Sequence, residues 1–199
     1  AKVARRKSAD WPTYRHDGAR SGRTGAAVPP TLGAKWKADV GGRLSSVTVA
    51  DAKVFVASID RHTVHALDAA NGKQRWRYTA GGRVDSPPSV AAGRVVFGSA
   101  DGHVYCLRGS DGVLVWRFRA APLERRIMAY GQLESAWPVH GSVLVLENAV
   151  YFVAGRSSYL DGGLALYRLD LKTGELLARR RIYSRDPETG EQPDEPIMF

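Results

Sequence analysis

The side chains that could bind or transform a ligand gather in two segments of this 199-residue sequence, 121–140 and 155–163. The first supplies Arg125, Arg126, Gln132, Glu134, Trp137 and His140, and the second supplies Arg156, Ser157, Tyr159 and Asp161. Hydrogen-bond donors, acceptors and an aromatic surface in such a mixture suit a carbohydrate, a quinone or a peptide. An alternative interpretation is that Arg125 with Glu124, and Arg156 with Asp161, pair locally and only hold the loops in place.

Familiar catalytic and metal-binding motifs are missing from the sequence. It contains no G-x-S-x-G, no His-Glu-x-x-His and no phosphate-binding loop of the Walker type. Cys106 is the only cysteine, so neither an internal disulfide nor a multi-cysteine metal site can form. His140, expected on an innermost strand, would need at least two further ligands to hold a metal ion. We therefore assign no catalytic, cofactor-binding or metal-binding residue from the sequence.

The elements that must position these side chains follow an internal repeat. Trp36, Trp76 and Trp116 are spaced forty residues apart, and so are Gly72 and Gly112. The stretch "ALDAANGKQRW" that ends at Trp76 corresponds to "CLRGSDGVLVW" that ends at Trp116, and "GGRLSS" corresponds to "GGRVDS". A fixed period of this length is the signature of a repeat architecture.

Short apolar runs that alternate with period two lie between these anchors. They occupy 53–58, 63–68 and 74–79 in one copy, and 94–99, 103–108 and 113–118 in the next. With a first strand in "LSSVTVA" and "VDSPPSV", each copy contains four strands joined by hairpins. The dipeptides Asn71-Gly72 and Asp111-Gly112 predict type I′ turns. Four antiparallel strands in each forty-residue unit predict the blade of a β-propeller, and hence an all-β fold.

The repeated tryptophans have a packing role in such a propeller. An indole on the outermost strand can lie between adjacent blades, and Ala66, Gly72 and Gly112 leave room for it. We therefore expect Trp36, Trp76 and Trp116 to be docking residues. A longer third copy has its strands in "VLVLENAVYFVAG" and "ALYRLDLKTGELLARRRIY", with Ala178 in the tryptophan position.

The repeat divides the chain into blades and connecting segments. About three blades and one closing strand cannot complete a ring, because propellers have four to eight blades. We expect a fragment of a larger propeller, of eight blades by our prediction, whose third blade leaves an apolar face uncovered and makes the isolated chain self-associate. The expected division is a basic linker (1–9), an opening segment with a closing outer strand (10–43), blade 1 (44–82), blade 2 (83–120), an inserted loop or short helix (121–136), blade 3 (137–185) and a polar loop (186–199) toward the next blade. Neither 1–9 nor 186–199 is expected to hold regular secondary structure.

The charge distribution argues against nucleic acid as a partner. The formal net charge is +9, but residues 1–37 hold nine Lys and Arg against two Asp, so the remainder is close to neutral. Binding to nucleic acid requires a basic stripe across the folded surface rather than a basic leader. No stretch of about eighteen apolar residues occurs, so we also predict no membrane-spanning segment.

Several stretches resemble a known family. "ALDAANGKQRW" resembles the tryptophan-docking motif of the pyrroloquinoline-quinone (PQQ)-like repeat, with Ala, Asp two residues on, a glycine turn and Trp. "DWPTYRHDGARSG" is similar to the opening segment of exported bacterial propellers of this family. "LESAWPVHGSVLV" and "GRSSYLDGG" are similar to segments of such proteins from planctomycete-type bacteria. The resemblance covers roughly residues 10–185 and is specific for fold rather than for function.

The resemblance implies two different kinds of function. Quinoprotein dehydrogenases of the family bind PQQ and calcium on the propeller axis, and methanol-dehydrogenase-like members place a vicinal disulfide over the quinone. BamB-type members are scaffolds in outer-membrane protein assembly. None of the enzymes' functional residues can be carried over to this chain, and Cys106 alone cannot form the vicinal disulfide.

We therefore expect a non-catalytic binding or scaffold module in the periplasm or cell envelope of a bacterium. Its expected partners are a protein or a polysaccharide, together with the remaining blades of the same propeller. The alternative is a quinoprotein oxidoreductase, a PQQ- and calcium-dependent alcohol or sugar dehydrogenase with most catalytic residues outside this chain. PQQ and calcium enter these expectations by family resemblance alone.

Overall fold

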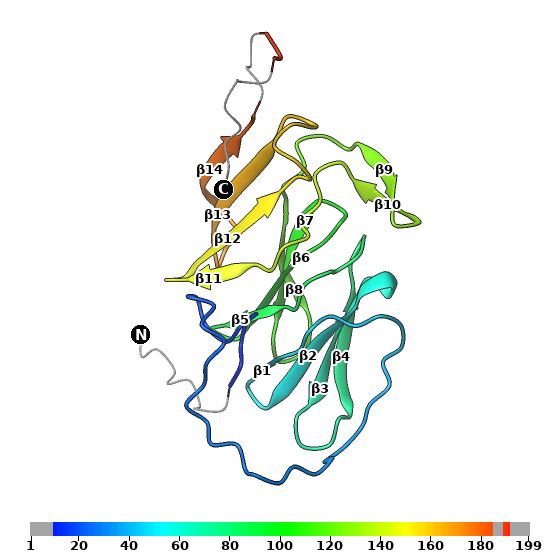
Figure 1. The fold of residues 1–199 in the computed structure, drawn as a ribbon, viewed down its shortest axis with the longest axis vertical. Helices are drawn as coiled ribbons and strands as arrows, with labels where there is room; N and C mark the ends of the chain where they lie inside the picture. The colour runs from blue at the N-terminus through cyan, green and yellow to red at the C-terminus, as the bar shows by residue number, and fades with distance from the viewer. Residues whose placement is uncertain (1–9, 185–188, 192–199) are drawn as a thin grey trace.

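The fold consists of three four-stranded antiparallel sheets side by side and one two-stranded sheet, as the computed structural model shows (Figure 1). The structure describes residues 10–184 and 189–191. Apart from one short 3-10 helix, η1 (Ile59–Arg61), every regular element among these residues is a strand. The all-β prediction is therefore confirmed. The expectations for 1–9 and for most of 186–199 lie outside the described residues, and 189–191 contain no strand or helix.

The three large sheets have the same strand order from the inner to the outer edge. Blade 1 contains β1 (Thr48–Ala50), β2 (Lys53–Ser58), β3 (Thr63–Asp68) and β4 (Gln74–Thr79). Blade 2 contains β5 (Ser89–Ala91), β6 (Arg94–Gly98), β7 (His103–Arg108) and β8 (Leu114–Arg119). Blade 3 contains β11 (Leu144–Leu146), β12 (Ala149–Ala154), β13 (Leu164–Asp170) and β14 (Leu176–Ile182). Contacts of β5 with both β1 and β11 bring the inner strands together, as in a sector of a propeller.

The repeat extends to the irregularities of the sheets. The pairing of the two outer strands shifts register after Ala66 in blade 1, after Cys106 in blade 2 and after Arg168 in blade 3. Ala66 faces Trp76 across this pair, and Arg168 faces Ala178. Ala178 therefore occupies in blade 3 the position that tryptophan holds in the other blades.

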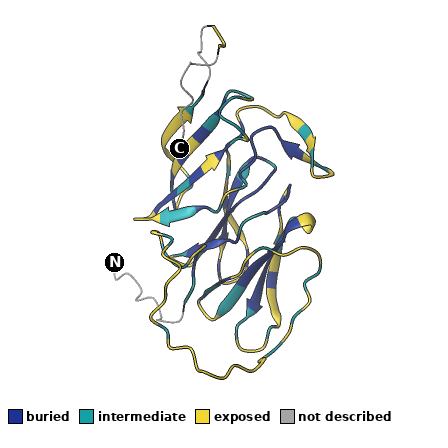
Figure 2. Cartoon of the chain, viewed as in Figure 1, coloured by how far each residue is buried: buried dark blue, intermediate teal, exposed yellow. Residues whose placement is uncertain are grey.

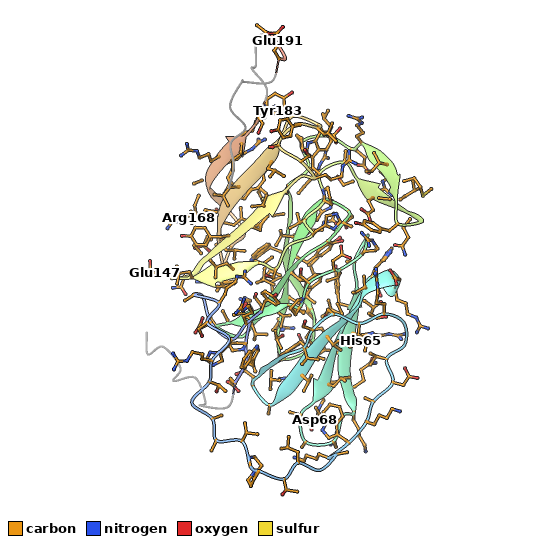
Figure 3. All side chains as sticks on the ribbon, viewed as in Figure 1. His65, Asp68, Glu147, Arg168, Tyr183 and Glu191 are labelled. Atoms are coloured by element: carbon orange, nitrogen blue, oxygen red, sulfur yellow. The ribbon has the colours of Figure 1, made fainter. Side chains whose placement is uncertain are left out.

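The outer hairpins differ from the predicted type I′ turns. In blade 1, Asp68 N donates to the Lys73 carbonyl at 2.8 Å, which encloses a loop of four residues rather than two. The Asp68 carboxylate accepts the amide of Ala70 at 2.7 Å, and only Gly72 in this loop has a positive φ, of 72°. The prediction was wrong because it considered the Asn-Gly dipeptide alone and not the acidic residue that caps the loop. Asp68 lies at this end of β3 (Figure 3).

Each tryptophan reaches from its own strand or segment to the outer hairpin of the next blade. Trp76 Nε1 donates to the Gly109 carbonyl at 3.1 Å, and a Cβ atom at Gly112 would lie 2.7 Å from the indole. Trp116 Nε1 donates to Leu171 O at 3.0 Å and packs on Gly174 in the same way. Trp76 and Trp116 are 7% and 8% exposed, so both indoles are buried between sheets.

Trp36 makes the same contact with blade 1 but belongs to no strand. Its Nε1 donates to Ala69 O at 3.1 Å and its ring covers Gly72. The segment 32–40 pairs with no described residue, which agrees with the expectation that this closing strand would run alone without the other strands of its blade. The indole therefore docks without the blade to which the prediction assigned it.

The apolar core fills the two interfaces between adjacent blades. One cluster joins blades 1 and 2 around Phe55, Trp76 and Phe97, and the other joins blades 2 and 3 around Trp116 and Phe152. Figure 2 shows this buried material inside the sheets, with β14 exposed at the edge. Every β14 residue except Ile182 is exposed.

The opening segment makes hydrogen bonds with the inner edge of each of the three blades. Trp11 exchanges two backbone hydrogen bonds with Val49 of β1, and Val90 of β5 donates to the Pro12 carbonyl at 2.7 Å. Arg20 reaches the loop before β11, where it donates to the Ser142 hydroxyl at 2.6 Å. The segment therefore crosses one blade after another along their inner strands, beside β1, β5 and β11 (Figure 1).

Candidate functional site: an inserted hairpin tied to three blades

The segment expected to be a loop or a short helix (121–136) contains a β-hairpin. Strands β9 (Arg126–Ala129) and β10 (Gln132–Ser135) form it, and it stands beside the large sheets (Figure 1). Tyr130 and Gly131 form its two-residue turn with φ values of 51° and 74°, as a type I′ turn requires. The alternating burial of β9 reflects a strand with one face on the protein, which fits this pairing and not a helix.

The tip of this hairpin contacts blade 1. Gln132 Oε1 lies 2.7 Å from the His62 Nε2 atom, just after η1. The Gln132 amide also donates to the Asp60 carbonyl at 3.3 Å. Gln132 therefore anchors the hairpin to the loop between β2 and β3.

The base of the hairpin is fixed to blade 2 by a buried ion pair. Arg83 donates to the Glu134 Oε1 atom from Nε at 2.6 Å and from a terminal nitrogen at 2.5 Å. The side chains of Arg83 and Glu134 are 3% and 1% exposed. The Tyr130 ring covers the guanidinium at 4.3 Å, and Ser135 N donates to Ala100 O at 2.8 Å. A charged pair this deeply buried is held strongly, because separating it would leave an uncompensated charge in the protein.

His140 and Asp85 extend this ion pair toward solvent. His140 Nδ1 lies 2.6 Å from the Asp85 carboxylate, and its Nε2 lies 3.7 Å from Glu134 Oε2. Burial raises the pKa of Asp85, but the hydrogen bond with His140 and the Arg83 charge outweigh it and hold that pKa below its usual value. Glu134 Oε2 is buried with no hydrogen-bond partner among the described residues. His140 precedes β11 and is not part of it, contrary to the prediction.

Asp161 connects the hairpin segment to blade 3. Its carboxylate accepts hydrogen bonds from Arg125 at 2.9 Å and from Arg156. Its carbonyl accepts the indole N–H of Trp137 at 2.7 Å. The local-pairing interpretation therefore holds for Arg156 with Asp161. It is wrong for Arg125, which binds the other inserted segment because Asp161 is within its reach and only 8% exposed.

The other predicted residues contribute less to this arrangement. Arg126 pairs with Glu124 at 3.1 Å on the surface. The Ser157 hydroxyl accepts the Tyr159 amide at 3.1 Å, which shapes the loop between β12 and β13. Sequence reasoning missed Arg83, Asp85, His62 and Tyr130. The repeated "GGRVDS" contains the first two, but its recurrence in both copies indicates only a connector between blades.

Large apolar side chains of the inserted segment face solvent. Met128 is 69% exposed, Tyr130 80% and Leu133 57%, and Leu123 before the hairpin is 62% exposed. The polar side chains of the hairpin contact the three blades, whereas these apolar ones have no cover. The hairpin is therefore a fixed support for a small apolar surface.

The described residues hold no ready cluster of acidic side chains for the calcium of the family's enzymes. Calcium takes six to eight oxygen ligands, mostly from carboxylates and carbonyls. Among residues 10–184 and 189–191, no group of three or more His, Cys, Asp or Glu side chains could hold a metal ion. Asp85 and Glu134 are already engaged by His140 and Arg83. We derive no chemical step through these groups.

The fold and the repeated tryptophan docking define a PQQ-like repeat β-propeller. The family model described as outer membrane protein assembly factor BamB matches residues 18–193, and the chain belongs to this family. The BamB of Burkholderia pseudomallei is 31% identical over 96 residues, which is 47% of this chain and 25% of that protein. The BamB of Yersinia pestis is 24% identical over 154 residues, 75% of this chain and 36% of that protein. The chain thus spans only about a quarter to a third of their length.

Solved structures of quinoprotein enzymes share the fold. A quinohemoprotein alcohol dehydrogenase from Pseudomonas putida HK5 superposes with a TM-score of 0.74 at 18% identity, over 92% of this chain and 28% of that one. The enzyme from Comamonas testosteroni gives 0.71 at 21% identity, over 95% and 29%. These likenesses concern the fold alone. In the described part of the chain, no helix is long and apolar enough to cross a membrane.

Proposed function

We propose that this chain is part of a non-catalytic propeller that binds a protein in the bacterial cell envelope and serves the assembly of outer-membrane proteins. Membership of the BamB family supports the assembly role and the envelope location. The observation that carries the proposal is the inserted hairpin, which three blades hold while Met128, Tyr130 and Leu133 face solvent.

A hairpin fixed in this way is suited to binding a protein. The contacts of Gln132, Glu134 and Arg125 order its backbone before any partner arrives, so little conformational entropy remains to be lost on binding. Tyrosine and methionine are enriched in the centres of protein interfaces, where a few such side chains supply most of the binding energy. Tyr130 presents one ring face to Arg83 and the other to solvent.

The test replaces the apolar side chains without disturbing the anchors. The double substitution Met128→Ser and Leu133→Ser is introduced into the full-length protein in its own bacterium, and the amount of folded outer-membrane β-barrel proteins is measured. We expect a fall to the level of the deletion strain. The matched control is Val113→Ser with Leu114→Ser, two exposed apolar residues 51% and 41% accessible on an outer hairpin. Normal assembly in the hairpin variant, or an equal defect in the control, would refute the proposal.

A quinoprotein oxidoreductase is the second candidate, favoured by the fold similarity to quinohemoprotein alcohol dehydrogenases. Titration of the full-length protein with PQQ and calcium separates the two functions. If the protein is a scaffold, titration with PQQ and calcium should give no saturable heat of binding. Saturable binding of one PQQ per chain, with dye reduction in the presence of an alcohol or a sugar, would establish the enzyme instead.

A further inference from the structure

A cavity of about 610 Å³ lies between blades 1 and 2, and its lining includes Arg125 and Ser135 from the base of the inserted hairpin. One wall consists of two rows on blade 2, in which Tyr105 pairs with Arg117 and His103 pairs with Arg119. Tyr78 and the end of β4 form the opposite wall, and residues 123–126 cover the cavity. Its volume is within the range of sites for small molecules, about 300–1,000 Å³.

The same wall recurs on blade 3, where the space is filled. There Tyr167 pairs with Arg179 and Ala165 pairs with Arg181, but the cavity measures only about 140 Å³. The long loop between β12 and β13 occupies it, and Arg181 donates to the Gly162 carbonyl. Between β6 and β7 the chain needs only residues 99–102, which leave the corresponding space open. Blade packing alone therefore does not require the larger cavity.

Two arginines of this larger cavity lack a carboxylate partner. Arg117 forms no hydrogen bond or ion pair with the described residues, and Arg119 donates only to the carbonyls of Ala121 at 2.9 Å and Pro122 at 3.5 Å. They follow each other at i and i+2 on β8, so both point to the same side of the sheet. Two uncompensated guanidinium groups side by side favour an anion, above all a carboxylate or a phosphate.

Two carboxylates limit which anion fits the cavity, Asp101 on the blade 2 wall and Glu124 in the cover. Asp101 accepts the Tyr105 hydroxyl and the His103 amide, the latter at 3.0 Å. Glu124, in the cover, pairs with Arg126 at 3.1 Å. These acceptors would repel a ligand with charge distributed over its whole surface, such as phosphate or an acidic peptide. They would instead accept hydroxyl groups of a ligand that has one acid at its end.

We infer that this cavity binds an acidic saccharide, a sugar chain with a carboxylate on its ring. Arg117 and Arg119 receive the carboxylate, while Asp101 and Glu124 accept hydroxyl groups. Tyr78 is half-buried, packs on Phe97 and Tyr105 and lines the cavity, where it provides an aromatic surface for the apolar face of the sugar. The inference does not rest on protein binding by the hairpin, because it uses the Arg117 and Arg119 wall of blade 2 and not the exposed Met128, Tyr130 and Leu133.

The test is calorimetric titration of the chain with digalacturonate, and with galactobiose and inorganic phosphate as separate probes. We expect one digalacturonate per chain, with a dissociation constant below about 1 mM and at least about tenfold weaker binding of the other two probes. Arg117→Gln should weaken digalacturonate binding at least about tenfold, because it removes one charged donor pair. Arg179→Gln is the matched control on the filled wall of blade 3, and its binding should stay within about twofold of the parent.

Three results would overturn the inference. They are an absence of saturable binding by digalacturonate, equal binding of phosphate or galactobiose, and an equal loss of affinity in Arg179→Gln. Thermal unfolding of each variant establishes that it is folded. Should Arg117→Gln not fold, Arg117→Lys keeps the charge but loses the paired donors, and unchanged affinity in that variant would also contradict the inference.

Discussion

Truncation of Trp76 should destabilise the chain strongly, because its indole joins blades 1 and 2. The side chain is 7% exposed, rests on Gly112 and donates a hydrogen bond to Gly109 O at 3.1 Å. A buried tryptophan removes about 150–250 Å² from water, worth about 4–6 kcal/mol at about 25 cal/mol per Å². Part of that area stays covered by neighbours after truncation. We therefore expect Trp76→Ala to lower the free energy of unfolding by about 3–5 kcal/mol.

Trp36 provides an internal comparison for this prediction. It makes the same hydrogen bond and the same contact with a hairpin glycine, but it is partly exposed and lies outside any strand. Trp36→Ala should therefore cost only about half as much, since less apolar area leaves water at that site. The two tryptophans differ in burial but make the same contact, so the difference between their costs reports the effect of burial.

Urea unfolding followed by far-ultraviolet circular dichroism measures both effects. The free energies should be compared at equal m-values, because a changed m-value would indicate a change in the denatured state or in cooperativity. A cost below about 1 kcal/mol for Trp76→Ala, or a larger cost for Trp36→Ala, would refute the reasoning that burial between blades sets the contribution.

Three further predictions concern buried polar groups. Glu134→Gln should lower the free energy of unfolding by about 3 kcal/mol in the same assay, because it leaves a buried guanidinium without its nearest counter-charge, whereas the exposed Glu124→Gln should cost under about 1 kcal/mol. Burial raises the pKa of the Cys106 thiol to about 12, so it should react with a disulfide reagent only when the chain unfolds, and rapid labelling of the folded chain would contradict this. Burial opposes ionisation of Asp101, but hydrogen bonds, first from His103, hold its pKa below the ordinary 3.8. Its contribution to stability is therefore present above about pH 4 and is lost as the pH falls further. Asp101→Asn should flatten the acid limb of a curve of stability against pH. An unchanged acid limb would show that ionised Asp101 does not stabilise the fold.

The strands of the repeated blades could be predicted from the sequence. The runs at 53–58, 63–68 and 74–79 coincide with β2, β3 and β4, because they are short, rich in β-branched and aromatic residues and bounded by turn residues. Only β4 has one exposed face, whereas β2 and β3 are buried along most of their length. The strands β9 and β10 produced no such pattern. They form a two-stranded sheet of short strands whose exposed faces carry Met128 and Leu133, so no apolar period distinguishes them from a loop or a helix.

The ion pairs of the site could not be predicted in the same way. Arg83 and Glu134 are 51 residues apart, and neither belongs to a local pattern that identifies a partner. Asp161 binds Arg125 over 36 residues for the same reason. The sequence indicated which segments hold polar side chains, while the packing of the blades decides which of them meet.

We propose that the apolar tip of the inserted hairpin contacts a protein during outer-membrane assembly. The most direct measurement is site-specific photocrosslinking in the living bacterium, with a photoreactive amino acid in place of Tyr130 of the full-length protein and in place of Val113 as control. We expect a discrete crosslink from position 130, but not from 113, to an outer-membrane β-barrel protein or a component of its assembly machinery. No crosslink at position 130, or the same products from both positions, would contradict it.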